Sequence, residues 1–232
     1  MYVIITGASR GIGRALAYIY AKHKYNLFLT CKKNISKLYE LKNELEEKYG
    51  IVVVIKKGHI EKTDLKNIDN IFLLINNASI SEYNLFCDTK IEKYYEIIDS
   101  NIIDCLLATK YVLLKMQKNK FGLIINISSI WGLVGSSMES IYSLTKGGII
   151  AFTKSLAKEN EFMDVSIISI ALGMVDTDMN NYLSESDKKF VIDKLDNKKM
   201  MSVEFVADKI FEISTKKLYN NGDIIEINNG LK

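Results

Sequence analysis

The chain has 232 residues, of which 48% are hydrophobic and 25% are charged, and its formal net charge is +3. This length suits one domain with a sizeable core, and the small net charge argues against nucleic acid as a partner. No apolar run reaches the ~18 residues typical of a membrane span. The first predicted strand begins at Tyr2, so we expect no signal peptide and a cytoplasmic location.

The cysteines and histidines indicate no metal site. Cys31, Cys87 and Cys105 lack the spacing of metal ligands, and three cysteines cannot all pair within one chain. Reduced thiols are therefore expected. His23 and His59 lie far apart in the sequence.

Apolar runs alternate with amphipathic segments along the chain, a pattern typical of βαβ units around a parallel sheet. We predict strands near residues 2–6, 26–30, 51–55, 71–75, 122–128, 165–171 and 223–227. We predict helices near 11–23, 35–49, 91–118, 140–160, 185–195 and 202–214, with room for only a turn of helix within 59–70. The predicted fold is a single doubly wound α/β domain over residues 1–232, with a mostly parallel seven-stranded sheet.

A glycine-rich segment, Thr6 to Gly13, lies between the first predicted strand and the first predicted helix. A dinucleotide phosphate site of the Rossmann type requires this strand–turn–helix context. Gly7 and Gly11 allow a tight turn close to the phosphates, and Gly13 allows the helix to pack closely on the sheet. The free N–H groups of the helix N-terminus favour a pyrophosphate. The spacing is G-x-x-x-G-x-G rather than the common G-x-G-x-x-G.

Three further residues predict acid–base chemistry. Tyr142 and Lys146 are four positions apart, so on a helix they share one face. An ammonium beside a phenol favours the phenolate and lowers a pKa that is normally ~10. Ser129 follows another strand and could hold a carbonyl oxygen. Because Gly7, Asn76, Ser129 and Gly173 all follow predicted strands, we expect them to meet at the carboxyl edge of the sheet.

Together these segments resemble the short-chain dehydrogenase/reductase family over essentially the whole chain. The glycine turn and the set Ser129, Tyr142 and Lys146 match its cofactor loop and its catalytic trio. The other matching segments are "NNAS" at 76–79, Asn101, "ALGMVDTDM" at 171–179 and "GDIIEINNG" at 222–230.

This resemblance implies hydride transfer between a nicotinamide ring and a carbonyl or alcohol carbon. Tyr142 would act as general acid, and Ser129 would bind the substrate oxygen where negative charge develops. Lys146 would lower the pKa of Tyr142 and bind the nicotinamide ribose. Asn101 would hold a water that relays protons to Lys146; a polar residue satisfied inside a helix is the alternative.

The resemblance also implies a set of cofactor contacts. Thr177 and the backbone of Val175 would bind the nicotinamide carboxamide. No acid follows the second strand, whereas Lys32, Lys33 and Arg10 could pair with a 2′-phosphate, so we expect NADPH rather than NADH. The implied cofactor-binding residues are Gly7, Ser9, Arg10, Gly11, Ile12, Gly13, Lys32, Asn77, Ala78, Tyr142, Lys146, Gly173, Val175 and Thr177.

Three positions depart from the family pattern. Leu172 stands where the family usually has proline, and Ser79 replaces the glycine of its Asn-Asn-Ala-Gly turn. His59 stands in place of an aspartate that touches adenine; it could contact the adenine itself or be a surface histidine.

Two groups within the family offer different substrates. The overall resemblance is to 3-oxoacyl-[acyl-carrier-protein] reductases, and Lys118 and Lys120 could attract an acidic carrier, although Met163 replaces a carrier-binding arginine. A local resemblance is to reductases of the 5-aminopentanone modification on elongation factor P. In that case Trp131 would form an apolar wall and Glu139 would pair with an amine; a subunit contact and a solvated surface charge are the alternatives.

Other expectations concern a non-enzymatic role, the oligomeric state and a lid. A non-enzymatic NADPH-binding regulator is an alternative of another class, but such a protein has no need of Tyr142. The family implies a homotetramer, with the helices near 91–118 and 140–160 packing across a two-fold axis. The charged segment 179–196 would form a lid.

Overall fold

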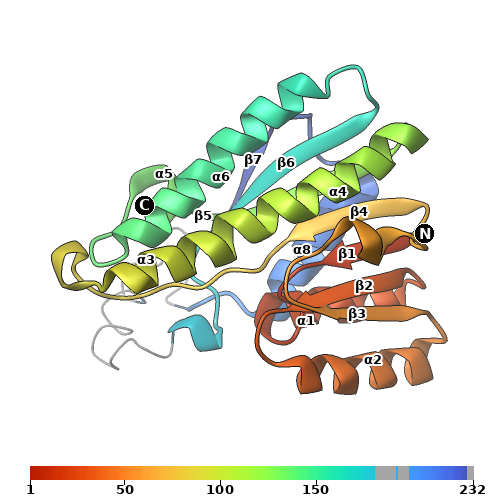
Figure 1. Ribbon diagram of the computed structural model, residues 1–232, viewed down its shortest axis with the longest axis horizontal. Coiled ribbons are helices and arrows are strands. Elements are labelled where there is room, and N and C mark those ends of the chain that lie inside the picture. Colours follow the sequence, from red (N-terminus) through yellow and green to blue (C-terminus); the bar gives the residue numbers. More distant parts are fainter. Residues whose placement is uncertain (181–191, 193–198, 229–232) are drawn as a thin grey trace.

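Seven parallel strands form one sheet, in the order β3-β2-β1-β4-β5-β6-β7 (Figure 1). The computed structural model describes residues 1–180, 192 and 199–228. All the predicted strands are present. They are β1 (Tyr2–Ile5), β2 (Asn26–Cys31), β3 (Val53–Lys57), β4 (Ile71–Asn76), β5 (Gly122–Ser129), β6 (Val165–Leu172) and β7 (Ile224–Ile227).

The central strands are apolar because helices cover both faces of the sheet. In β1, Val3, Ile4 and Ile5 are all fully buried, and their side chains alternate between two core layers. The strand order reverses between β1 and β4, and such a switch point leaves a crevice at the carboxyl ends of the strands.

The helices divide between the two faces of the sheet. Helices α1 (Gly11–Lys22), α2 (Ile35–Tyr49) and α8 (Val203–Lys216) pack on the face that contains Val3. Helices α4 (Asp104–Asn119) and α6 (Ser140–Glu159) pack on the face that contains Ile4 (Figure 1).

The long helix predicted near 91–118 has an interruption. It consists of α3 (Ile91–Ile98), a π-helical turn (Asp99–Ile103) and α4. Such a turn widens the helix by one residue and is frequent at functional sites. Residues 59–70 contain one 3-10 turn, Lys62–Leu65, which confirms the turn predicted there.

Some local elements of the structure were not predicted, and some predicted segments lie outside the described residues. A short helix, α5 (Trp131–Val134), follows β5, and 3-10 turns form at Phe86–Asp88 and Asp178–Asn180. The helix predicted near 185–195 and most of the predicted lid fall outside the described residues, as does the end of the last family segment.

The described part of the chain holds neither a membrane-spanning helix nor a metal-binding cluster. No helix there is both long and apolar enough to cross a bilayer, and no group of three or more histidine, cysteine or acidic side chains is arranged to hold a metal ion.

Candidate active site

A cavity of about 820 Å³ opens at the carboxyl edge of the sheet. The loops that follow β1, β2, β4, β5 and β6 form its walls. It brings together most of the residues predicted for catalysis, cofactor binding and substrate contact; of these, Gly13 and Asn101 do not line it, and neither do Asn76 and His59. The others are Gly7, Ser9, Arg10, Gly11, Ile12, Lys32, Asn77, Ala78, Ser129, Trp131, Glu139, Tyr142, Lys146, Gly173, Val175 and Thr177.

Two glycines of the turn at one end of the cavity, Gly7 and Gly13, have no room for a side chain. Gly7 has a φ of +68°, and a Cβ on it would lie 2.8 Å from the Cα of Ala78. A Cβ on Gly13 would lie 2.4 Å from the carbonyl oxygen of Gly7. These approaches bring the backbone of the turn close to the loop after β4.

The side chain of Asn77 holds the glycine turn in place. Its Nδ2 donates to the carbonyl oxygens of Thr6 at 2.9 Å and Gly7 at 3.3 Å. In return, the hydroxyl oxygen of Thr6 accepts from the backbone N–H groups of Asn77 and Ala78, both at 3.0 Å. The Asn77 amide therefore contributes to the site by fixing the backbone around it.

Asn101 lies in the π-helical turn and is only 3% exposed. Its Oδ1 accepts from the N–H of Ile80 at 2.8 Å, and its Nδ2 donates to the Ile80 carbonyl oxygen and to the Thr145 hydroxyl, both at 3.0 Å. Thr145 in turn donates to the carbonyl oxygen of Tyr142 at 2.7 Å. Asn101 thus joins the loop after β4 to helix α6, which carries Tyr142.

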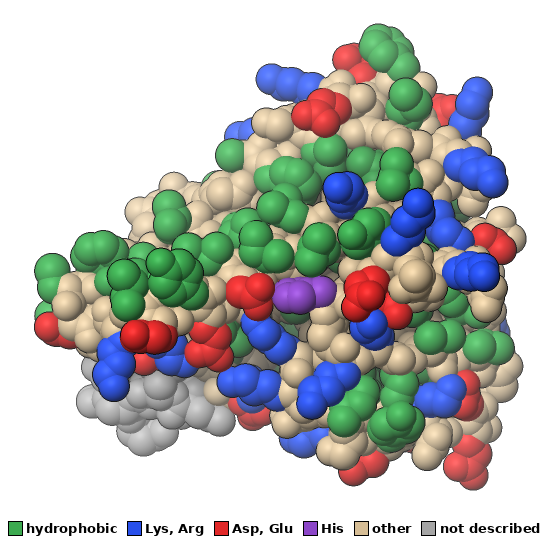
Figure 2. All heavy atoms as spheres, viewed as in Figure 1, with side chains coloured by type: hydrophobic (Ala, Val, Ile, Leu, Met, Phe, Trp, Pro, Cys, Tyr) green, Lys and Arg blue, Asp and Glu red, His purple; other side chains and the backbone are tan. Residues whose placement is uncertain are grey.

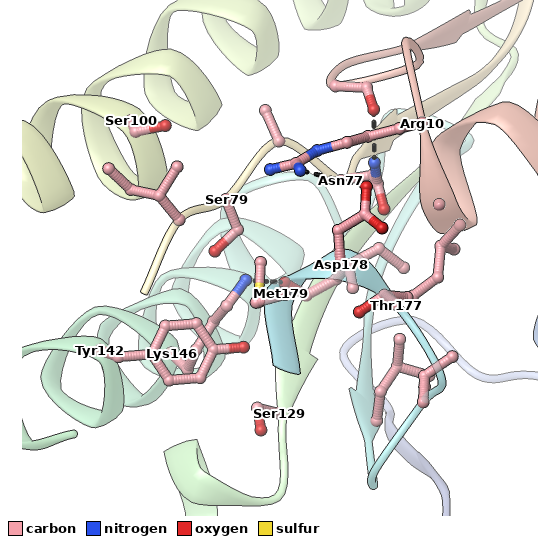
Figure 3. Close-up of a pocket in the computed structure, with 18 of the residues that line it drawn as sticks. Arg10, Asn77, Ser79, Ser100, Ser129, Tyr142, Lys146, Thr177, Asp178 and Met179 are labelled. Atoms are coloured by element: carbon pink, nitrogen blue, oxygen red, sulfur yellow. Dashed lines mark hydrogen bonds and ion pairs between the residues drawn. The ribbon is translucent and has the colours of Figure 1, made fainter. Parts of the chain in front are cut away.

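Ser129, Tyr142 and Lys146 surround the opposite end of the cavity. Figure 3 shows the Tyr142 ring and the Lys146 side chain together, with Ser129 on the neighbouring strand end. The Lys146 Nζ lies 5.5 Å from the centroid of the Tyr142 ring and donates to the carbonyl oxygen of Ile127 at 2.9 Å. The shared helix face predicted for Tyr142 and Lys146 is therefore present.

Burial shifts the pKa values of Tyr142 and Lys146 in opposite directions. It lowers the pKa of Lys146 to about 8. Burial also raises the pKa of Tyr142; the nearby charge of Glu139 raises it further, whereas the hydrogen bond with Ser129 lowers it. The net direction for Tyr142 is opposite to the one expected from a lysine neighbour alone. The reason is that removing a phenolate from water raises the pKa by more than the hydrogen bond with Ser129 lowers it.

Trp131 and Glu139 border the same end of the cavity, as expected for substrate contacts. Glu139 is 8% exposed, and its Oε1 accepts from the Ser81 hydroxyl at 2.5 Å. Trp131 begins α5, which packs tightly on α6: a Cβ on Gly132 would lie 2.7 Å from the carbonyl carbon of Lys146. Sequence reasoning missed both Ser81 and α5.

At the glycine end, each predicted phosphate-binding cation has an acidic partner. Lys32 Nζ lies 2.5 Å from Asp99, Lys33 Nζ lies 3.2 Å from Glu96, and an Arg10 nitrogen lies 3.3 Å from Asp178. Figure 3 shows the Arg10–Asp178 pair at the cavity wall. Sequence reasoning did not anticipate these three pairs, although Asp178 lies in the matched segment 171–179.

His59 does not line the cavity. Its Nδ1 lies 2.9 Å from Asp104 and its Nε2 lies 3.4 Å from Asp99. The contacts of His59 with two carboxylates were not predicted.

The residues around the cavity fit a dinucleotide. Positive φ angles at Gly7 and Gly11 turn the backbone at the start of α1, and cations line the wall beside it. The Ser79 hydroxyl is buried and has no hydrogen-bond partner among the described residues. A buried polar group in a cavity wall is satisfied when a ligand supplies the partner.

The chain matches a known protein family over most of its length. Residues 1–188 match the sequence model of a family described as short chain dehydrogenase. The chain belongs to this family. Its relatives include the 3-oxoacyl-[acyl-carrier-protein] reductase FabG of Aquifex aeolicus (strain VF5), which is 33% identical, with 98% of this chain and 96% of the relative covered.

Two more relatives of this short-chain dehydrogenase cover similar spans. The uncharacterized oxidoreductase YmfI of Bacillus subtilis (strain 168) is 30% identical, over 98% of this chain and 97% of the relative. FabG of Vibrio harveyi is 28% identical, over 98% and 96%. The protein is therefore an NAD(P)H-dependent oxidoreductase that acts on hydroxyl or carbonyl groups.

Proposed function

We propose that this short-chain dehydrogenase reduces a ketone with NADPH, in the manner of a 3-oxoacyl-[acyl-carrier-protein] reductase. The observation that carries the proposal is the convergence of Ser129, Tyr142 and Lys146 on the cavity that also contains the glycine turn. Relatives that bear the reductase name cover almost the whole chain.

The cofactor, when bound, supplies the hydride. The Ser129 hydroxyl binds the substrate oxygen, and Tyr142 gives its proton to that oxygen as negative charge develops there. The raised pKa of Tyr142 keeps this proton in place at neutral pH. Lys146 binds the nicotinamide ribose, and its charge stabilises the phenolate left on Tyr142.

The reduction is expected to slow above pH 8. The pKa of Lys146 is lowered to about 8, so its ammonium is lost as the pH rises through that value. Tyr142 remains protonated there because its own pKa is raised. The pH profile of kcat/KM reports the groups of the free enzyme and should be level from pH 6 to pH 7, then fall with a midpoint near pH 8. A profile that stays level to pH 10 would contradict the role of the Lys146 charge.

The preference for NADPH rests on Arg10, Lys32 and Lys33, which lie where the cavity meets the glycine turn. Guanidinium and ammonium groups are the usual partners of a phosphate. The side chains of the partners Asp178, Asp99 and Glu96 are 58%, 42% and 32% exposed, and ion pairs near the surface contribute only about 0–1 kcal/mol. The pairs therefore do not prevent the cations from binding a phosphate.

Lys118 and Lys120, which could attract an acidic carrier, lie away from the catalytic end of the cavity. Both lysines precede β5, whereas Ser129 ends it, so they lie near the edge of the sheet opposite the cavity. An eight-residue strand spans about 26 Å at ~3.3 Å per residue. A carrier bound at these lysines would have to reach across this distance to present its substrate to Tyr142.

A second substrate is favoured by Glu139, whose carboxylate is buried beside Tyr142. A buried carboxylate in a substrate mouth suits an amine-bearing ketone, such as the 5-aminopentanone group on elongation factor P. Glu139→Gln keeps the size of the side chain and removes its charge. With an amine-bearing ketone we expect kcat/KM to fall about 10-fold or more, whereas a neutral ketone should be affected much less. Equal effects on both ketones would exclude recognition of an amine by Glu139.

The deciding experiment measures NADPH oxidation by the purified protein. Acetoacetyl thioesters and elongation factor P with the ketone modification are offered in separate assays. Turnover of the thioester alone would support the acyl reductase, and turnover of the modified protein alone would support the second candidate. Turnover of either one would also exclude a regulator that merely binds NADPH.

We also propose that the protein is a homotetramer. Figure 2 shows hydrophobic side chains gathered over α3 and along α4 and α6. Tyr95, Leu114 and Leu144 on these helices are 69%, 55% and 63% exposed, and such a patch marks a contact surface. Light scattering should give a mass near four times 26.4 kDa, and Leu114→Glu should lower it. A mass of one chain would contradict the tetramer.

A further inference from the structure

The part of the cavity next to the glycine turn carries acids as well as bases. Lys32 and Lys33 follow β2, and their partners Asp99 and Glu96 come from the helical segment across the cavity mouth. Lys32, Lys33 and Glu96 line the cavity wall. Two of the three cations that would bind a 2′-phosphate are therefore held by carboxylates of one segment.

Asp99 is the acid that is held most firmly. One of its oxygens lies 2.5 Å from Lys32 Nζ, and the other lies 3.4 Å from His59 Nε2. The His59 Nδ1 in turn lies 2.9 Å from Asp104, which is 8% exposed at the start of α4. The contacts of His59 with both acids hold the Asp99 carboxylate beside Lys32.

Asp99 keeps its charge at neutral pH. Lys32 donates to it and lowers its pKa, and His59 adds to the same effect, while partial burial opposes it. Glu96 also has a lowered pKa, first because of Lys93 and then because of Lys33. Glu96 is therefore shared between two lysines, whereas among the described residues Asp99 pairs with one lysine, Lys32.

A 2′-phosphate carries a charge of about −1.5 to −2 at neutral pH. To bind Lys32 it must share or replace the Asp99 carboxylate, and it then lies within a few ångströms of a like charge. Ribose hydroxyls carry no charge, so a cofactor without the 2′-phosphate is not repelled in this way. Asp99 therefore acts differently on the two cofactors.

We propose that Asp99 is a specificity-determining residue that competes with the 2′-phosphate for Lys32 and so reduces the preference for NADPH over NADH. This inference rests on the NADPH site of the proposed function. Because Asp99 competes for Lys32, the preference for NADPH over NADH is weaker than the three cations at the site suggest.

The test uses Asp99→Asn, which keeps the size of the side chain and removes its charge. Calorimetry measures the binding of 2′,5′-ADP and 5′-AMP, two probes that differ by the phosphate alone. We expect the dissociation constant of 2′,5′-ADP to fall about 3- to 10-fold and that of 5′-AMP to change less than about 2-fold. The gain should shrink in about 1 M salt, where charges are screened beyond ~3 Å.

Asp69→Asn is the matched control. Asp69 also pairs with a lysine, Lys115, at 3.2 Å, but it precedes β4 and so lies at the edge of the sheet away from the cavity. This substitution should leave the binding of both probes unchanged. Thermal unfolding of each variant checks that the fold is intact.

An unchanged or smaller preference for 2′,5′-ADP in Asp99→Asn would overturn the inference, because Asp99 would then orient Lys32 rather than compete for it. The NADPH proposal is tested separately by the wild-type protein. If the wild-type protein bound 2′,5′-ADP no more tightly than 5′-AMP, that proposal would fail. The effect of Asp99→Asn on the ratio of the two constants can be measured in either case.

Discussion

Replacing Tyr142 with phenylalanine is expected to lower kcat about 10²- to 10⁴-fold, the range over which a general acid contributes. The ring remains and continues to fill its place beside Lys146. The lost group is the hydroxyl that is hydrogen-bonded with Ser129 and faces the cavity. Binding of NADPH, followed by its fluorescence, should change less than about 3-fold because the glycine turn is untouched.

The control for this variant is Tyr39→Phe. Tyr39 lies on α2, is 56% exposed and does not line the cavity. Its replacement should leave kcat and cofactor binding unchanged. If Tyr142→Phe kept a tenth or more of the wild-type kcat, proton donation by Tyr142 would have to be abandoned.

Replacing Gly13 with alanine is expected to destabilise the protein by about 3 kcal/mol. The new Cβ would lie 2.4 Å from the carbonyl oxygen of Gly7 and 2.9 Å from the Cα of Ala8. Both neighbours are backbone atoms of the turn, so the turn itself has to move. Denaturant unfolding should show the loss of stability, and NADPH should bind more weakly because the turn would form its phosphate site.

Gly148→Ala is the matched substitution for Gly13→Ala. Gly148 lies inside α6, and within the described part of the chain a Cβ there would meet the Ile102 side chain alone, at an ordinary 3.8 Å. Alanine in a helix interior is more stable than glycine by about 0.5–1 kcal/mol. The two variants should therefore shift the unfolding midpoint in opposite directions. An unchanged midpoint for Gly13→Ala would mean that the helix can move away from the turn at little cost.

Much of the fold was predictable because its signals are local. A strand buried on both faces needs a continuous apolar run, and the runs at Val3–Ile5 and Leu123–Ile125 are of this kind. Residues that follow parallel strands meet at one edge of the sheet, so the joint placement of Gly7, Ser129 and Gly173 around one cavity could be expected. The glycine turn depends on backbone sterics, which the residue type alone determines.

The π-helical turn and the partners of Asn101 were not predictable in the same way. The run 91–118 has a helical pattern throughout, and nothing in its residue types indicates the change of hydrogen bonding at Asp99–Ile103. The Thr145 contact of Asn101 comes from a position 44 residues away along the chain.

The amino-acid sequence by itself determined the parallel sheet, the glycine turn and the residue types that gather at its carboxyl edge. The tertiary structure alone decided the balance of charges there. It placed Asp99 beside Lys32 across 67 positions of the chain, and it raised the pKa of Tyr142 where a neighbouring lysine suggested the reverse. The physical reason is that ion pairing and desolvation depend on distance and burial in three dimensions, which spacing along the chain does not specify.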